Sequence, residues 1–149
     1  MSWAPHQQTR LAQESYLLRR EMPDFAFYEP TGNTHVQGIW RSQKYNFYSI
    51  RIDIPPGYPD ECPHTYIEWP TPLLDYNDQY MTSIGTSHHY HTWETDRAGM
   101  VKICTYRPEY WNSSNTTVQL IQKAFLWIIA YEEHRATGKQ ISDLLLTMH

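Results

Sequence analysis

The sequence is short of basic residues and of long apolar runs. Lys and Arg total 12 against 16 Asp and Glu, which gives a formal net charge of −4 with the histidines neutral. A nucleic-acid-binding protein normally shows a basic excess clustered on one face, so we expect no nucleic-acid partner. No apolar run approaches the roughly 18 residues that a membrane span needs, so we expect no membrane partner either.

Cysteine is also scarce, with only Cys62 and Cys104. The first six residues lack the basic-then-apolar pattern of a secretory signal, and we therefore expect a cytoplasmic location. In that reducing compartment cysteines are more often thiols than disulfides. What the chain does contain is 40% hydrophobic and 15% aromatic residues, enough for one folded domain over residues 1–149.

The hydrophobic pattern predicts a helix followed by four short strands. Leu11, Leu18 and Met22 fall on one stripe of a helix over residues 9–22, which Pro23 stops. Residues 48–54 alternate apolar and polar side chains, as a half-buried antiparallel strand does. The other predicted strands cover residues 25–28, 34–40 and 65–69.

Two unusual segments follow the clearest strand. Residues 55–63 hold four prolines, which fix the backbone and predict a rigid bend. Residues 71–111 show no regular element of any length, and a loop this long tends to be functional. Three of the eight histidines and Cys104 lie in it, together with Trp93 and Trp111.

A second helix begins after Thr116, which forms a capping-box pattern with Gln119. Its apolar stripes are broad, so it should be largely buried, and Gly138 ends or interrupts it. A last helical segment is predicted over residues 141–146. Strands grouped together, with helices kept apart from them, indicate an α+β domain with a four-stranded antiparallel sheet.

The order of motifs in the chain resembles the ubiquitin-conjugating enzymes. Residues 45–63 resemble the third strand and the "YP…P" bend of that family, and the run from His91 to Cys104 resembles its "HPN…G…IC" segment. Trp111 and residues 115–117 resemble the tryptophan and helix start that follow the catalytic cysteine. The resemblance spans residues 9–131, whereas residues 127–138 look like bacterial conjugating-enzyme-like proteins, which occur with ubiquitin-like or anti-phage signalling gene clusters.

This resemblance implies a transferase without a cofactor, in which Cys104 carries a protein C-terminus as a thioester. The carried protein would be a ubiquitin-like modifier or a bacterial nucleotidyltransferase, delivered by an adenylating (activating) enzyme and passed to an acceptor protein, in anti-phage defence. The first helix is where the family meets its activating enzyme, which makes interface candidates of Arg10, Arg19 and Arg20.

The chain departs from the family pattern around the thiol. Thr92 and Trp93 stand where the family has proline and the asparagine thought to support the oxyanion. By resemblance, His91 is the structural histidine of the family turn and, with His89, a catalytic candidate beside Cys104, while Trp93 is a candidate for the substrate groove or a partner surface. His89 and its neighbour His88 are expected to act as proton carriers or oxyanion donors in place of the asparagine.

The residues taken alone leave several alternatives open. Cys104 could be a buried small hydrophobe, and Cys62, in the rigid bend, is interpreted as structural. Tyr110 and Trp111 could be core aromatics that anchor the loop or a wall of the groove for the incoming tail. His89, His91 and Cys104 could instead form a three-ligand zinc site of a hydrolase, although we expect no metal. A non-catalytic binding module of the same fold is the remaining alternative.

Overall fold

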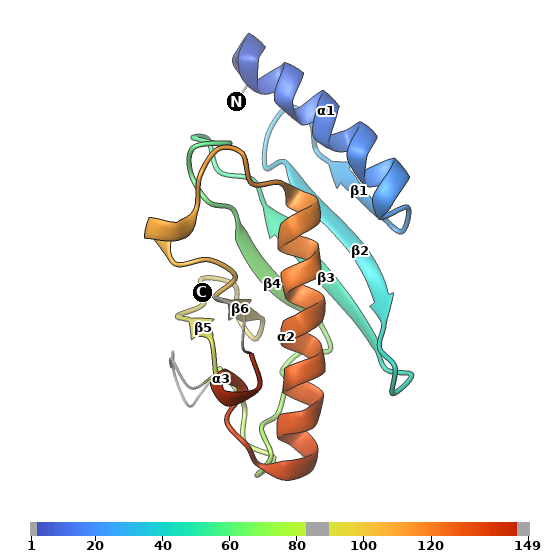
Figure 1. Cartoon of the computed structure of the whole chain (residues 1–149), viewed down its shortest axis with the longest axis vertical. Coiled ribbons are helices and arrows are strands. Elements are labelled where there is room, and N and C mark those ends of the chain that lie inside the picture. The colour runs from blue at the N-terminus through green and yellow to red at the C-terminus, as the bar shows by residue number, and fades with distance from the viewer. Residues whose placement is uncertain (1–2, 83–89, 146–149) are drawn as a thin grey trace.

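The computed structural model describes residues 3–82 and 90–145 as an antiparallel sheet with helices at its edge and on one face (Figure 1). The helices are α1 (Pro5–Glu21), the short 3₁₀ turn η1 (Pro108–Tyr110), α2 (Thr117–Thr137) and α3 (Ile141–Leu144). The strands are β1 (Phe25–Tyr28), β2 (His35–Arg41), β3 (Phe47–Asp53), β4 (His64–Trp69), β5 (Thr92–Trp93) and β6 (Val101–Ile103). None of the helices in the described ranges has the length and apolar character that crossing a membrane requires.

The strands follow the order β1-β2-β3-β4-β6-β5, and every neighbouring pair is antiparallel. The α+β class, the N-terminal helix, the antiparallel sheet and the C-terminal helices are therefore confirmed. The number of strands is not, because the sheet has six strands and we expected four. The two additional strands and η1 lie in residues 71–111, where no regular element was expected. With two and three residues, β5 and β6 are too short to show an alternating pattern.

The main core lies between the sheet and α2. Tyr48, Ile50 and Ile52 of β3 point to the same face and are buried, as their spacing of two residues predicts. They share one apolar cluster with residues of α2 such as Ile121 and Trp127, both fully buried. Figure 1 shows α2 running along this face of the sheet.

The ends of α2 match the predicted signals. The Thr116 hydroxyl accepts a hydrogen bond from the Gln119 backbone N–H at 3.3 Å, and the Gln119 side chain accepts one from the Thr116 N–H at 3.0 Å. Gly138 ends the helix with φ of 77°, a left-handed conformation that glycine adopts without strain. The helix α1, by contrast, begins four residues before the predicted start, because Pro5 occupies its first turn and Gln7 accepts from the Ala4 N–H at 3.0 Å.

A buried carboxylate joins α1 to the rest of the fold. Glu14 is 2% exposed and accepts hydrogen bonds from the Tyr58 hydroxyl (2.6 Å) and from the Thr117 N–H (2.9 Å) and hydroxyl (2.7 Å). The Arg10 guanidinium lies 2.8 Å from the same carboxylate. Glu14 therefore fixes α1 to both the proline-rich bend and the first turn of α2.

Candidate active site

Cys104 follows directly after β6, and the ladder of the sheet fixes its backbone. Its N–H donates a hydrogen bond to the carbonyl of His91 at 2.8 Å, and the preceding residue, Ile103, pairs with Thr65 of β4 and Thr92 of β5. The side chain is 8% exposed, which is low for a thiol that has to reach a substrate. No disulfide involves it.

Burial raises the pKa of the Cys104 thiol above its ordinary value. Three charges modify this effect: Arg107 and Lys123 lower the pKa, and Glu109 raises it. Cys104 is therefore mainly a neutral thiol at neutral pH, with two cations that favour its ionised form.

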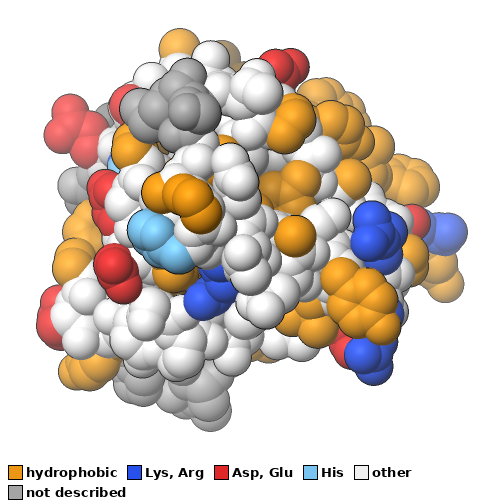
Figure 2. All heavy atoms as spheres, turned by 90° about the horizontal axis from the view of Figure 1, so that it is seen from above, with side chains coloured by type: hydrophobic (Ala, Val, Ile, Leu, Met, Phe, Trp, Pro, Cys, Tyr) orange, Lys and Arg blue, Asp and Glu red, His pale blue; other side chains and the backbone are white. Residues whose placement is uncertain are grey.

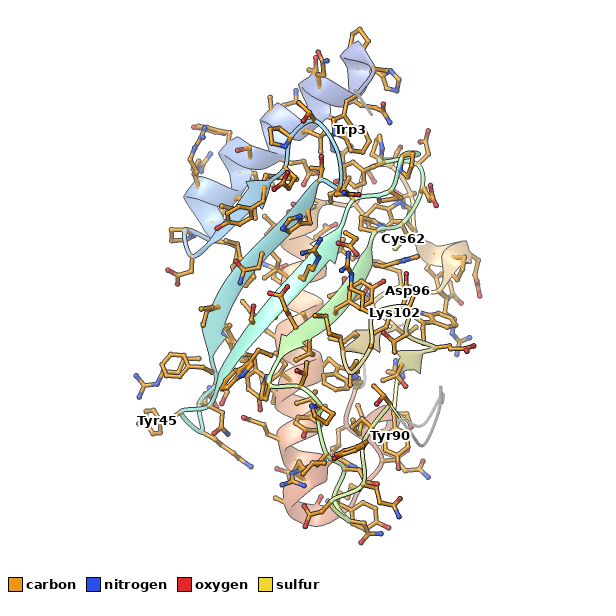
Figure 3. All side chains as sticks on the ribbon, turned by 180° about the vertical axis from the view of Figure 1, so that it is seen from behind. Trp3, Tyr45, Cys62, Tyr90, Asp96 and Lys102 are labelled. Carbon is orange, nitrogen blue, oxygen red and sulfur yellow. The ribbon has the colours of Figure 1, made fainter. Side chains whose placement is uncertain are left out.

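A cavity of about 460 Å³ lies next to the segment that carries Cys104, although Cys104 itself does not line it, and we call it the thiol groove. It is lined by Glu61, Cys62, Pro63, His64, Trp93, Glu94, Lys102, Ile103, Thr105, Tyr106 and Pro108. Residues on both sides of Cys104 thus belong to its walls, which are mostly apolar or aromatic with a few charges. Figure 3, which shows the molecule from behind, labels Cys62 and Lys102 of these walls and places them close together.

Cys62 forms part of the groove wall and is half-buried. Its thiol donates a long hydrogen bond to the Pro63 carbonyl at 3.4 Å. Burial, together with the nearby Cys104, raises the pKa of the Cys62 thiol to about 12. Cys62 was interpreted as a buried structural residue, whereas its side chain is only half-buried and forms part of the cavity wall.

His91 contributes to the site through its backbone. It is 7% exposed, and its φ of 52° turns the chain so that its carbonyl reaches the Cys104 N–H. His88 and His89 lie outside the described residues, so their predicted role stays a prediction. Within residues 3–82 and 90–145 no three His, Cys, Asp or Glu side chains are arranged to hold a metal ion.

The structure separates the predicted aromatic residues. Trp93 lines the thiol groove and is 42% exposed, whereas Tyr110 is 54% exposed in η1 and is not among the groove residues. Trp111 is buried, and its indole N–H donates to the Pro59 carbonyl at 2.9 Å. Its ring meets Tyr106 edge-on, with 5.3 Å between ring centroids. Trp111 therefore anchors the segment after Cys104 to the proline-rich bend.

The segment before Cys104 is anchored on the face of the sheet that points away from α2. Arg97 donates to the Asp53 carboxylate at 2.8 Å, and the Tyr66 hydroxyl donates to Asp96. Lys102 of β6 lies 3.9 Å from Asp96. Figure 3 shows Asp96 and Lys102 side by side. These contacts hold residues 96 and 97 against β3 and β4.

The three arginines belong to α1, which packs against α2 and against β1, the edge strand opposite β5 in the sheet. Arg10 is bound internally: besides Glu14, it donates to the carbonyl of Asn115 at 2.6 Å. Arg19 and Arg20 are exposed, and Arg20 lies over the Tyr16 ring at 5.8 Å. Figure 2, seen from above, shows basic side chains next to hydrophobic ones toward the side on which α1 lies in Figure 1.

Three groove-side residues were missed by the sequence analysis. His64 and Lys102 line the groove, and the ammonium of Lys123 on α2 contacts the ring of Tyr106, another groove residue. Of these, only Lys123 had a usable signal, since a lysine within a broad apolar helix is unexpected unless it has a specific environment.

A second cavity, of about 440 Å³, lies near the other end of α2. Its buried carboxylate, Glu132, already accepts hydrogen bonds from Ser42, Asn46 and Tyr48 at 2.7–2.9 Å. None of the described residues that line this cavity is a cysteine or a histidine. The thiol groove is therefore the better candidate for chemistry.

Comparison with known proteins gives no identification. No family model matches the chain, and no curated protein or solved structure matches it either.

Proposed function

We propose that the chain is a ubiquitin-conjugating-enzyme-like transferase that carries a protein C-terminus as a thioester on Cys104. The observation that carries this proposal is the position of the cysteine: it directly follows a short strand, and its two neighbours in the chain, Ile103 and Thr105, line a groove whose walls are mostly apolar and aromatic. An extended chain end with small residues fits such a groove. The resemblance of the ordered motifs to the conjugating enzymes indicates which reaction the thiol would perform, namely acyl transfer.

The reaction consists of two acyl transfers. The Cys104 thiolate attacks the thioester carbonyl of the incoming protein, a carbon–sulfur bond forms, and the donor thiol leaves with a proton. An acceptor amine then attacks the same carbonyl, the amide bond forms, and Cys104 leaves as a thiolate that takes up the proton lost by the amine. Sulfur is nucleophilic enough that a small ionised fraction supports the first step, so the raised pKa of Cys104 is compatible with this function.

The carried protein is proposed to be a ubiquitin-like modifier or a bacterial nucleotidyltransferase, supplied by an activating enzyme in the cytoplasm as part of anti-phage defence. The low exposure of Cys104 and the absence of the family asparagine favour the second candidate, a non-catalytic binding module of the same fold. In that case the groove would bind a chain end without forming a covalent bond.

The test uses a synthetic peptide that ends in Gly-Gly and carries a C-terminal thioester of 2-mercaptoethanesulfonate. We expect incubation with the intact protein to give one adduct, detected by intact mass, that a reducing thiol removes. Cys104→Ala should abolish the adduct, and Cys62→Ser should retain it. An adduct that persists in Cys104→Ala contradicts the proposal. Peptide binding without an adduct supports the binding module.

The partner surface on α1 can be tested with the same variants and an activating enzyme. We expect Arg19→Glu combined with Arg20→Glu to slow loading by the activating enzyme and to leave loading by the peptide thioester unchanged. Arg10 is unsuitable for this test because its guanidinium is part of the Glu14 contacts. If the activating enzyme loads the double variant and the unchanged protein equally fast, these arginines are not part of the interface.

A further inference from the structure

Lys123 occupies an unusual place for a lysine. It lies on α2 between buried residues such as Leu120 and Trp127, and its side chain is half-buried. The ammonium nitrogen stands 3.9 Å from the centroid of the Tyr106 ring, two residues after Cys104. Among the residues that the structure describes, no carboxylate forms an ion pair with it.

A half-buried ammonium without a carboxylate partner is costly unless something compensates for its lost hydration. Burial accordingly lowers the pKa of Lys123, and the two groups that oppose this effect are the thiols of Cys104 and Cys62. The Tyr106 ring supplies a cation–π contact as partial compensation. The Lys123 ammonium therefore lies against the ring of Tyr106, which follows the proposed nucleophile by two residues and lines the thiol groove together with Cys62.

We propose that Lys123 supplies the fixed positive charge that assists Cys104 when the thiol reacts. Its ammonium, held against the Tyr106 ring, stabilises the thiolate before attack and again when Cys104 leaves. Its protonated form is the one that acts, and it acts through Cys104 without contacting the substrate. The inference rests on the proposed function only for the transfer step, because the effect of Lys123 on the Cys104 thiol does not depend on the substrate.

Arg107 also acts on Cys104, and its contribution can be separated from that of Lys123. The two cations lower the pKa of the thiol against the effect of burial, Arg107 first and Lys123 second. Arg107 is exposed, whereas Lys123 is half-buried beside the aromatic wall. Because salt screens exposed charges much more than buried ones, high salt should remove the effect of Arg107 and leave most of that of Lys123.

The experiment measures the rate at which iodoacetamide alkylates Cys104, by peptide mass, between pH 6 and pH 10 in a Cys62→Ser background. We expect Lys123→Met to raise the pH midpoint of alkylation by about one unit and to slow the reaction at pH 7 about tenfold. The limiting rate at high pH should not change, because the access of the reagent is the same. Lys123→Arg should restore the midpoint, and Lys123→Gln repeats the test if the methionine variant folds poorly.

The controls make the outcome specific. Lys44→Met, an exposed lysine that lines only cavities near the other end of α2, should leave the midpoint unchanged. Arg107→Gln should raise the midpoint at low salt but not at 0.5 M salt, whereas the effect of Lys123→Met should persist. An unchanged midpoint in Lys123→Met, or a lowered limiting rate with the same midpoint, overturns the inference. If the midpoint shifts but the peptide thioester never loads Cys104, the inference stands and the proposed transferase function fails.

Discussion

Loss of the Glu14 carboxylate is expected to destabilise the fold more than any other loss of a single charge on α1. Glu14→Ala would leave the Tyr58 hydroxyl and the Thr117 N–H buried without their acceptor, at a cost of about 1 kcal/mol or more for each group. It would also remove the partner of Arg10, and breaking a buried ion pair costs about 3–5 kcal/mol. Because these contributions overlap, we expect a total loss of about 3–5 kcal/mol in the free energy of unfolding.

The assay is urea unfolding followed by tryptophan fluorescence. Glu14→Gln should cost about half as much as Glu14→Ala, since the amide oxygen still accepts hydrogen bonds. Glu21→Ala, at an exposed position on the same helix, is the control and should change the free energy by less than about 0.5 kcal/mol. Tyr58→Phe and Glu14→Ala should be non-additive when combined. A loss below about 1 kcal/mol in Glu14→Ala, or full additivity with Tyr58→Phe, would show that this network does not hold α1 in place.

Three further predictions concern other parts of the sheet. Gly38→Ala should cost at least about 1–3 kcal/mol, because a Cβ there would lie 2.5 Å from the buried Phe25 ring; a thermal melt unchanged by the substitution would contradict this contact. Burial and Lys102 lower the pKa of His64 below its ordinary value of 6.5. As the pH falls, the unfolded chain therefore binds a proton at His64 more readily than the folded chain does, and stability is lost below about pH 6.5. The fall should be smaller in His64→Gln, measured by unfolding at pH 5 and pH 7.5, and equal slopes in the two proteins would refute this role. Arg97→Gln should speed hydrogen exchange in residues 94–100 with little effect on α1, since its 2.8 Å contact with Asp53 fastens that segment; uniform exchange changes would show that the contact acts on global stability instead.

The elements that could be predicted from the sequence are those with a strong local signal. The alternation in β3 and the capping residues Thr116 and Gly138 were correctly assigned, because each depends on a few neighbouring residues. The strands β5 and β6 depend on pairing with β4, a long-range contact that leaves no pattern in two or three residues.

The candidate site shows the same limit. Cys104 and Trp93 could be singled out from ordered motifs; in the structure Trp93 lines the groove, and so do the two chain neighbours of Cys104. The burial of Cys104 and the contact of Lys123 with the Tyr106 ring could not be anticipated, because both depend on how the segment after β6 packs against the rest of the fold. Arg10 likewise read as a surface charge, although its partners are Glu14 and two carbonyls more than one hundred residues away.

The position of Cys104 follows from anchors on either side of it in the chain. Before it, Arg97 is tied to Asp53 on the face of the sheet away from α2; after it, Trp111 is tied to the Pro59 carbonyl in the bend. Between these anchors β6 pairs with both β4 and β5, so the thiol is held by the sheet and not by a free loop. With the backbone fixed in this way, substitutions in the groove should alter the rate of thiol chemistry mainly through charge and access. For that reason the pH midpoint of Cys104 alkylation, which reports charge, and its limiting rate, which reports access, are the two quantities that decide how this site works.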